Sequence, residues 1–133
     1  MKRNLTAPEL TRLETERNIW LATMRPDGRP HLVPIWFIWH EEQLFLGMKQ
    51  KSVKARNLQQ NPNVSLALED GSNVVICEGS AETYPQPWAA DLLAKFKAKY
   101  DWDIPGDPDG YGLIVKIKPK KWMMWGAEDE DEG

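Results

Sequence analysis

Residues 29–49, RPHLVPIWFIWHEEQLFLGMK, decide the fold of this chain. Apolar runs lie on both sides of Glu41-Glu42, which predicts two antiparallel strands, 29–39 and 43–49, joined by a tight turn. Because proline cannot donate a hydrogen bond to a β-ladder, Pro34 predicts a bulge or an edge position in the first strand. That strand is apolar on both faces, so it needs a closed barrel, a covering helix or a second subunit.

The segments on either side continue this pattern of short strands and turns. Further strands are predicted at residues 19–23, 63–69, 73–83, 111–118 and 122–125. Helices are predicted from Thr6 to about Glu16, over 52–60, and from Pro87 to Tyr100, and a loop over 101–110. The sequence therefore predicts a mainly β protein, a six-stranded antiparallel barrel with short flanking helices. We expect a single domain over 1–126, followed by an acidic, disordered tail at 127–133.

Composition and charge exclude several classes of protein. The 133-residue chain has a formal net charge of −3, but Glu128 to Glu132 are five consecutive acids, so the remainder carries +2. This is far less basic than a typical nucleic-acid-binding domain. The single Cys77 excludes an intramolecular disulfide, and with only two histidines no metal is expected. The apolar runs are shorter than the ~20 residues of a membrane span and no signal segment is evident, which favours a cytoplasmic protein.

The start of the helix at 52–60 has an unusual charge pattern. Ser52 is a natural N-cap, yet the first turn holds Lys54, and Lys49, Lys51 and Arg56 lie close by. A helix N-terminus carries partial positive charge, so each cation there costs about 0.3–1 kcal/mol. A bound phosphate would reverse that cost, because main-chain amides and cations would converge on one anion. The alternative is a lysine-rich turn that only maintains solubility.

No side chain stands out as a catalytic group. His31 reads as a partly exposed strand residue, His40 as a solvated turn residue, and Cys77 as a small core residue. The four aspartates between 101 and 109 lack the spacing of a calcium-binding loop. The strand around Pro34 offers main-chain groups and flat side chains to a heterocycle, although it also fits a plain barrel core.

Taken together, these segments resemble the pyridoxamine 5′-phosphate oxidase-like family of FMN-binding split β-barrels. The similarity is closest to the short branch that binds FMN or the related deazaflavin. The matching segments, in order, are Leu21-Ala22-Thr23, Pro26-Asp27-Gly28-Arg29-Pro30-His31, Val33-Pro34-Ile35-Trp36-Phe37, Ser52-Val53-Lys54-Ala55-Arg56-Asn57-Leu58 and Asn61-Pro62-Asn63-Val64-Ser65-Leu66. The resemblance implies a split barrel that forms a homodimer with two cofactor sites at the subunit interface.

The resemblance also implies which residues bind the cofactor. The strand from Leu32 to Phe37 would run along the flavin ring and ribityl chain, and Ser52 and Lys54 would hold the phosphate. Asn73 and Trp125 would reach the cofactor held by the opposing subunit. The expected cofactor-binding residues are Leu32, Val33, Pro34, Ile35, Trp36, Phe37, Gly47, Met48, Lys49, Lys51, Ser52, Lys54, Asn73 and Trp125.

Two departures from the family pattern shape the expected function. Val53 stands where the family commonly has arginine before the phosphate-binding lysine, so Lys51 or Arg56 would have to compensate. The basic C-terminal segment that grips substrate phosphate in true pyridoxamine phosphate oxidases is replaced here by Gly126-Ala127-Glu128-Asp129-Glu130-Asp131, an acidic segment. We therefore expect an FMN-dependent oxidoreductase acting on another small organic substrate. The alternatives are a deazaflavin-dependent reductase of the same fold and a non-catalytic flavin-binding protein.

Overall fold

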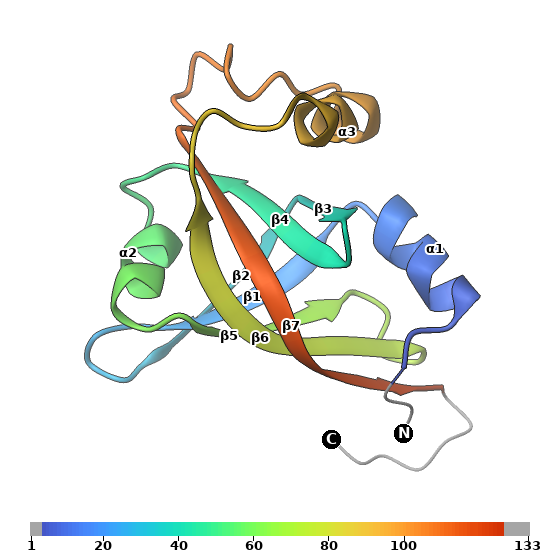
Figure 1. Ribbon diagram of the computed structural model, residues 1–133. Coiled ribbons are helices and arrows are strands. Elements are labelled where there is room, and N and C mark those ends of the chain that lie inside the picture. Colours follow the sequence, from blue (N-terminus) through green and yellow to red (C-terminus); the bar gives the residue numbers. More distant parts are fainter. Residues whose placement is uncertain (1–3, 127–133) are drawn as a thin grey trace.

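The computed structural model describes residues 4–126, in which three helices flank one seven-stranded antiparallel sheet. The helices are α1 (Ala7–Thr15), α2 (Val53–Gln60) and α3 (Ala90–Tyr100). The strands are β1 (Ile19–Met24), β2 (Pro30–Ile35), β3 (Phe37–His40), β4 (Gln43–Met48), β5 (Asn63–Leu68), β6 (Val74–Tyr84) and β7 (Leu113–Trp125). The sheet curls into a split barrel, and α1 and α2 lie on opposite sides of it (Figure 1). The expected acidic tail lies outside the described residues.

The sheet order, β2-β1-β5-β6-β7-β4-β3, explains why the barrel is split. Consecutive strands β2 and β3 occupy the two opposite edges, and Trp36 alone separates them in the chain. The prediction of one strand over 29–39 was therefore wrong, because its two halves pair with different neighbours, β1 and β4. Pro34 does lie in an edge strand, as expected.

The main chain at the split is held by the end of α3. The Phe37 N–H donates to the Tyr100 hydroxyl at 2.9 Å, and the Lys99 amine donates to the Phe37 carbonyl at 3.0 Å. The same hydroxyl lies 2.7 Å from the Arg17 carbonyl oxygen and 2.9 Å from that of Phe37, and its one proton serves one of them at a time. These bonds satisfy polar groups that the change of strand partner leaves without a ladder.

The C-terminal strand also differs from the prediction. In place of two strands at 111–118 and 122–125, one continuous strand, β7, pairs with β6 from Ile114 to Trp125. The register shifts where Glu78 faces Lys121 and Gly79 faces Pro119, which is a β-bulge at Lys120. Pro119 and Lys120, which lie between the two predicted strands, are thus accommodated within one strand by a bulge.

The helices begin where their capping residues predict, except for α3. The Glu9 carboxylate accepts the Thr6 N–H at 2.8 Å at the start of α1, and Ser52 caps α2. α3 begins at Ala90 rather than at Pro87, and the segment before it contains a cis Gln86–Pro87 bond. No helix within residues 4–126 is long and apolar enough to cross a membrane.

Two groups of buried side chains form the interior. One fills the barrel between the strands and the inner faces of α1 and α2, and includes Leu13, Leu21 and Leu46. The other packs α3 against β3 and β4, with Phe96 and Ile114 at its centre. The second group fixes α3, and therefore Tyr100, at the split of the barrel.

Candidate cofactor site

The start of α2 has the arrangement that the sequence predicts. The Ser52 side chain accepts the Ala55 N–H at 3.3 Å and donates to the Lys49 carbonyl at 2.8 Å, which fixes the turn before the helix. A buried bond of 3.0 Å from the Asn57 amide to the Thr23 hydroxyl pins α2 to β1. The first turn of α2 contains no acidic residue, so its free amides face no carboxylate of their own helix.

Lys54 is the best-placed cation at this helix start. Its side chain is half-buried, and burial, together with the nearby charge of Lys49, lowers its pKa below the usual 10.5. Burial, Arg25 and Lys54 similarly lower the pKa of His31 on β2. No carboxylate within residues 4–126 pairs with Lys54. A half-buried cation without a counter-ion, close to other cations, is an environment that favours an anion.

Lys54 lines a pocket of about 510 Å³ at the split between β2 and β3. The pocket brings together four parts of the chain that are far apart in sequence: the residue before β1, the end of β2, the region of β4 and α2, and the end of α3 with the segment that follows it. Its lining residues are Asn18, Pro34, Ile35, Trp36, Gly47, Lys54, Tyr100, Asp101, Trp102, Asp107, Asp109 and Tyr111. Five of these, Pro34, Ile35, Trp36, Gly47 and Lys54, belong to the expected cofactor site.

Aromatic rings form much of this pocket. Trp36 stacks on Tyr100 with ring centroids 4.5 Å apart and planes 7° apart, and it meets Trp102 edge-on at 5.7 Å. The Trp102 indole N–H donates to the Asp107 carboxylate at 2.6 Å. Gly47 is required below this ring, because a Cβ at Gly47 would lie 2.8 Å from Trp102. These contacts give the pocket flat walls of fixed orientation, suited to a planar ligand.

The main chain of β2 provides few donors toward its free edge. At the turn between β1 and β2, the Arg25 N–H donates to the Arg29 carbonyl, and hydrogen-bonded pairs alternate along the ladder from there. The main-chain groups of residues 30, 32 and 34 are therefore directed away from β1. Two of these are prolines, so only the Leu32 N–H is directed outward, while the Ile35 N–H is directed toward β1. The Trp36 N–H has no hydrogen-bond partner among the described residues, and Trp36 lines the pocket. Of the Ile35 and Trp36 main-chain N–H groups, only that of Trp36 is therefore available to a ligand in the pocket.

The remaining expected residues of this half of the site lie around the pocket rather than on it. Leu32 is 60 % exposed on the outer face of β2, and Val33 is half-buried on the opposite face. Phe37 and Met48 are fully buried, so their side chains belong to the core. Lys49 and Lys51, like Ser52, lie in the turn before α2. The Lys49 amine lies 5.4 Å from the centre of the Tyr111 ring, which does line the pocket.

Asn73 and Trp125 lie together, but in a different place. Both line a second pocket of about 250 Å³ beside α1, where β6 begins and β7 ends. Val74, next to Asn73, pairs directly with Trp125. Neither residue lines the pocket that contains Lys54 of the same chain.

The sequence reasoning missed the aromatic residues that come from the α3 region. The sequence predicts Tyr100 at the end of a helix, Trp102 in the loop over 101–110 and Tyr111 at the start of the strand over 111–118, and it assigns none of them to the cofactor site. The available signal was the aspartate-rich segment itself, which contains Trp102 and is followed directly by Tyr111. Burial raises the pKa of Tyr100 to about 12, so its hydroxyl keeps its proton and its hydrogen bonds at neutral pH.

The other titratable candidates divide between core and surface. Cys77 is 1 % exposed, and burial raises the pKa of its thiol to about 12, which confirms a core role. The prediction that His40 is solvated was wrong, because it is 8 % exposed. Asp101 pairs with Lys97 at 2.7 Å, and Asp107 is bonded to Trp102, so the aspartate-rich segment uses these carboxylates internally.

The comparisons with known proteins fit this architecture. The family model for pyridoxamine 5′-phosphate oxidase matches residues 7–126. No curated protein sequence matches the chain significantly.

Among solved structures, a conserved hypothetical protein from Mycobacterium tuberculosis is 27 % identical, with a TM-score of 0.74 over 95 % of this chain and 88 % of that one. An F420 reductase is 28 % identical, with a TM-score of 0.70 over 85 % of this chain and 94 % of the other. The heme storage protein HutZ from Vibrio cholerae shares the fold at 21 % identity, with a TM-score of 0.76 over 92 % and 98 % of the two chains. By its sequence match over 7–126 and its split barrel, the chain belongs to the pyridoxamine 5′-phosphate oxidase family.

Proposed function

We propose that this protein is a homodimeric, FMN-dependent oxidoreductase that acts on a small organic substrate other than a vitamin B6 phosphate. The single observation that carries the proposal is the half-buried Lys54, which has no carboxylate partner within residues 4–126 and lines an aromatic pocket at a helix start. A planar ring attached to a phosphate matches both properties: the ring fits the flat walls, and the phosphate fits the cation and free amides.

The residues present divide into two groups for such a cofactor. Ser52, Lys54 and the first amides of α2 would hold the phosphate. Trp36, through its side chain and its main-chain N–H, would contact the ring. When bound, FMN would supply hydride or electron transfer, and the protein would supply position and electrostatics. This division agrees with the lack of a catalytic acid or base in the sequence.

Surface composition supports the dimer. The exposed large hydrophobic side chains of the described residues are Met24, Leu32, Trp36 and Val53. All four belong to β1, β2, the β2–β3 junction and the start of α2, and the proposed dimer interface would cover them. In the proposed dimer, Asn73 and Trp125 of one subunit complete the site of the other.

Deazaflavin is the second candidate cofactor. Its longer acidic tail would need more positive charge than FMN does, and Lys49, Lys51 and Arg56 all lie close to Lys54 in sequence without an acidic partner among the described residues. The similarity to an F420 reductase, 28 % identical over 94 % of that chain, also supports deazaflavin as the cofactor.

Parallel titrations decide between these cofactors. Purified protein is titrated with FMN and with deazaflavin, and the quenching of each cofactor's fluorescence gives the dissociation constant. We expect tighter binding of FMN, and a deazaflavin constant at least tenfold lower than that for FMN would reverse the assignment. Failure of both to bind at 100 µM would remove the proposed function altogether.

Catalysis is tested on the loaded protein. Bleaching of the flavin absorbance by reduced nicotinamide, followed by reoxidation with an organic acceptor, is the expected result for an oxidoreductase. A flavin that binds tightly but reacts with neither donor nor acceptor would favour the non-catalytic alternative. The oligomeric state is measured by sedimentation, and a monomer that binds FMN with full affinity would contradict a site shared between subunits.

A further inference from the structure

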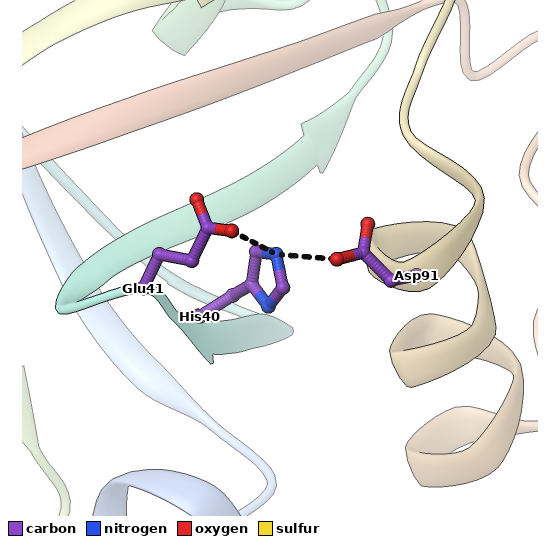
Figure 2. Close-up of side chains that lie close together, drawn as sticks. All are labelled: His40, Glu41 and Asp91. Atoms are coloured by element: carbon purple, nitrogen blue, oxygen red, sulfur yellow. Dashed lines mark ion pairs between the residues drawn. The ribbon is translucent and has the colours of Figure 1, made fainter.

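A second group of chemistry-bearing side chains lies away from the candidate cofactor site, between the β3–β4 hairpin and α3. His40 ends β3, Glu41 follows in the turn, and Asp91 lies in the first turn of α3 (Figure 2). The His40 Nε2 atom lies 3.6 Å from Glu41 Oε1 and 3.5 Å from Asp91 Oδ2. Figure 2 shows the two carboxylates approaching this nitrogen from opposite sides.

The histidine is buried and makes no hydrogen bond. His40 is 8 % exposed, and its ring packs edge-on against Phe45 with centroids 5.7 Å apart. Its Nδ1 atom is buried without a partner, and the two contacts of Nε2 are too long for charge-assisted hydrogen bonds, which measure about 2.7–2.9 Å. Within residues 4–126, therefore, a nine-tenths buried imidazole directs Nε2 between two carboxylate oxygens, at distances longer than a normal hydrogen bond.

Among the described residues, a hydrogen bond holds the Asp91 carboxylate in place, whereas none holds the Glu41 carboxylate. Asp91 Oδ1 accepts the Leu92 N–H at 2.9 Å, which leaves Oδ2 directed at His40. Glu41 has a left-handed backbone, with φ of 52°, and its exposed side chain reaches back over the hairpin to His40. No lysine or arginine of the described residues forms an ion pair with either acid. The negative charge of the pair is thus available to a cation.

We propose that His40, Glu41 and Asp91 form a binding site for a divalent transition metal, with Zn²⁺ as the best match. Zinc bonds of about 2.0–2.2 Å to nitrogen and oxygen place the donors of a tetrahedral site roughly 3.3–3.6 Å apart, and the two measured separations fit that spacing. One imidazole and two carboxylates are ligands that zinc accepts, whereas Ca²⁺ and Mg²⁺ prefer oxygen alone. A water molecule would complete the fourth position.

The metal would add a link between the β3–β4 hairpin and α3, two elements that also pack through the second group of buried side chains. His40 and Glu41 belong to the hairpin at the sheet edge, and Asp91 belongs to the helix whose far end holds Phe37 through Tyr100. Binding to the folded state alone raises its stability by mass action. The site shares no residue with the candidate cofactor site, so its existence does not depend on the proposed function.

Zinc binding is measured by calorimetry on the full chain without a polyhistidine tag, after removal of metals with a chelator. We expect one zinc per chain, with a Kd below about 100 µM. The isosteric variants Glu41→Gln and Asp91→Asn alter exposed carboxylates, so they keep the fold, and each weakens zinc binding at least tenfold. Glu42→Gln, the neighbouring exposed acid, is the matched control and leaves the Kd unchanged.

Further measurements test whether the metal binds to His40, Glu41 and Asp91. With Co²⁺ in place of zinc, tetrahedral coordination gives strong visible absorption, which both variants lose. Zinc also shifts the ¹⁵N resonance of His40 Nε2 and raises the thermal midpoint of the wild type, but not that of the variants. Absence of zinc binding up to 1 mM, or equal zinc binding by wild type, Glu41→Gln and Asp91→Asn, overturns the proposal.

Discussion

Replacing Lys54 with glutamine removes the half-buried cation that lines the aromatic pocket, and keeps a side chain of similar length. We expect this variant to bind FMN more weakly but to bind riboflavin, which has the same ring and no phosphate, as the wild type does. The reason is that Lys54 would pair with the phosphate alone, whereas Trp36 and the other pocket walls contact the ring.

The size of the effect follows from the environment of the amine. A hydrogen bond to a charged group contributes about 1.5–3 kcal/mol, which corresponds to a roughly 10- to 150-fold loss of FMN affinity. Burial and Lys49 already lower the pKa of Lys54, so the free protein loses this proton more readily than an exposed lysine does. A phosphate favours the protonated amine, so wild-type FMN affinity falls as the pH rises through the lowered pKa, and the variant lacks that step.

Fluorescence titrations of the wild type and Lys54→Gln with FMN and with riboflavin measure the four affinities of the cycle, and all four are repeated at a second salt concentration. Lys95→Gln is the matched control, because it removes the same charge from an exposed position on α3. We expect this control to change FMN affinity by less than twofold. If Lys54→Gln weakens FMN and riboflavin equally, or leaves FMN binding unchanged, the reasoning about the phosphate is refuted.

Three further predictions concern the packing that shapes the pocket. Gly47→Ala places a methyl group 2.8 Å from Trp102, and thermal unfolding should show a loss of about 1–3 kcal/mol together with weaker flavin binding. Tyr100→Phe leaves the buried Phe37 N–H without an acceptor, and chemical denaturation should show a loss of about 1–3 kcal/mol. Burial lowers the pKa of Lys99 from 10.5 to about 8, so the unfolded chain holds the proton more tightly above pH 8. The stability of the wild type relative to Lys99→Met should therefore rise between pH 7 and 9, by about 0.7 kcal/mol after discounting the ~1.4 kcal/mol limit for solvent screening.

Each of these predictions has its own control. Gly112→Ala meets no atom closer than 3.6 Å, so it should cost far less than Gly47→Ala, and equal losses would contradict the role given to Trp102. Tyr111→Phe removes a hydroxyl for which no hydrogen bond is found among the described residues, and it should leave stability nearly unchanged. A stability difference between wild type and Lys99→Met that is flat or falls from pH 7 to 9 would show that the amine is not desolvated.

Much of the fold could be predicted from local sequence because its signals are local. The capping residues Thr6 and Ser52 mark two helix starts, and Pro34 marks an edge strand, since each effect involves only neighbouring main-chain groups. The cationic start of α2 could also be predicted, because a helix terminus and its charges lie within a few residues of one another. These features suffice to predict a small antiparallel barrel with an anion site.

The tertiary structure decided where the barrel splits and what the pocket is made of. Residues on both sides of Trp36 follow the same apolar pattern, yet they form the two opposite edge strands of the sheet. The reason is that strand pairing depends on partners far along the chain. Tyr100, Trp102 and Tyr111 meet Trp36 and Lys54 only because α3 packs across the split. Periodicity reports which face of an element is apolar, but the element that covers that face is chosen by long-range packing.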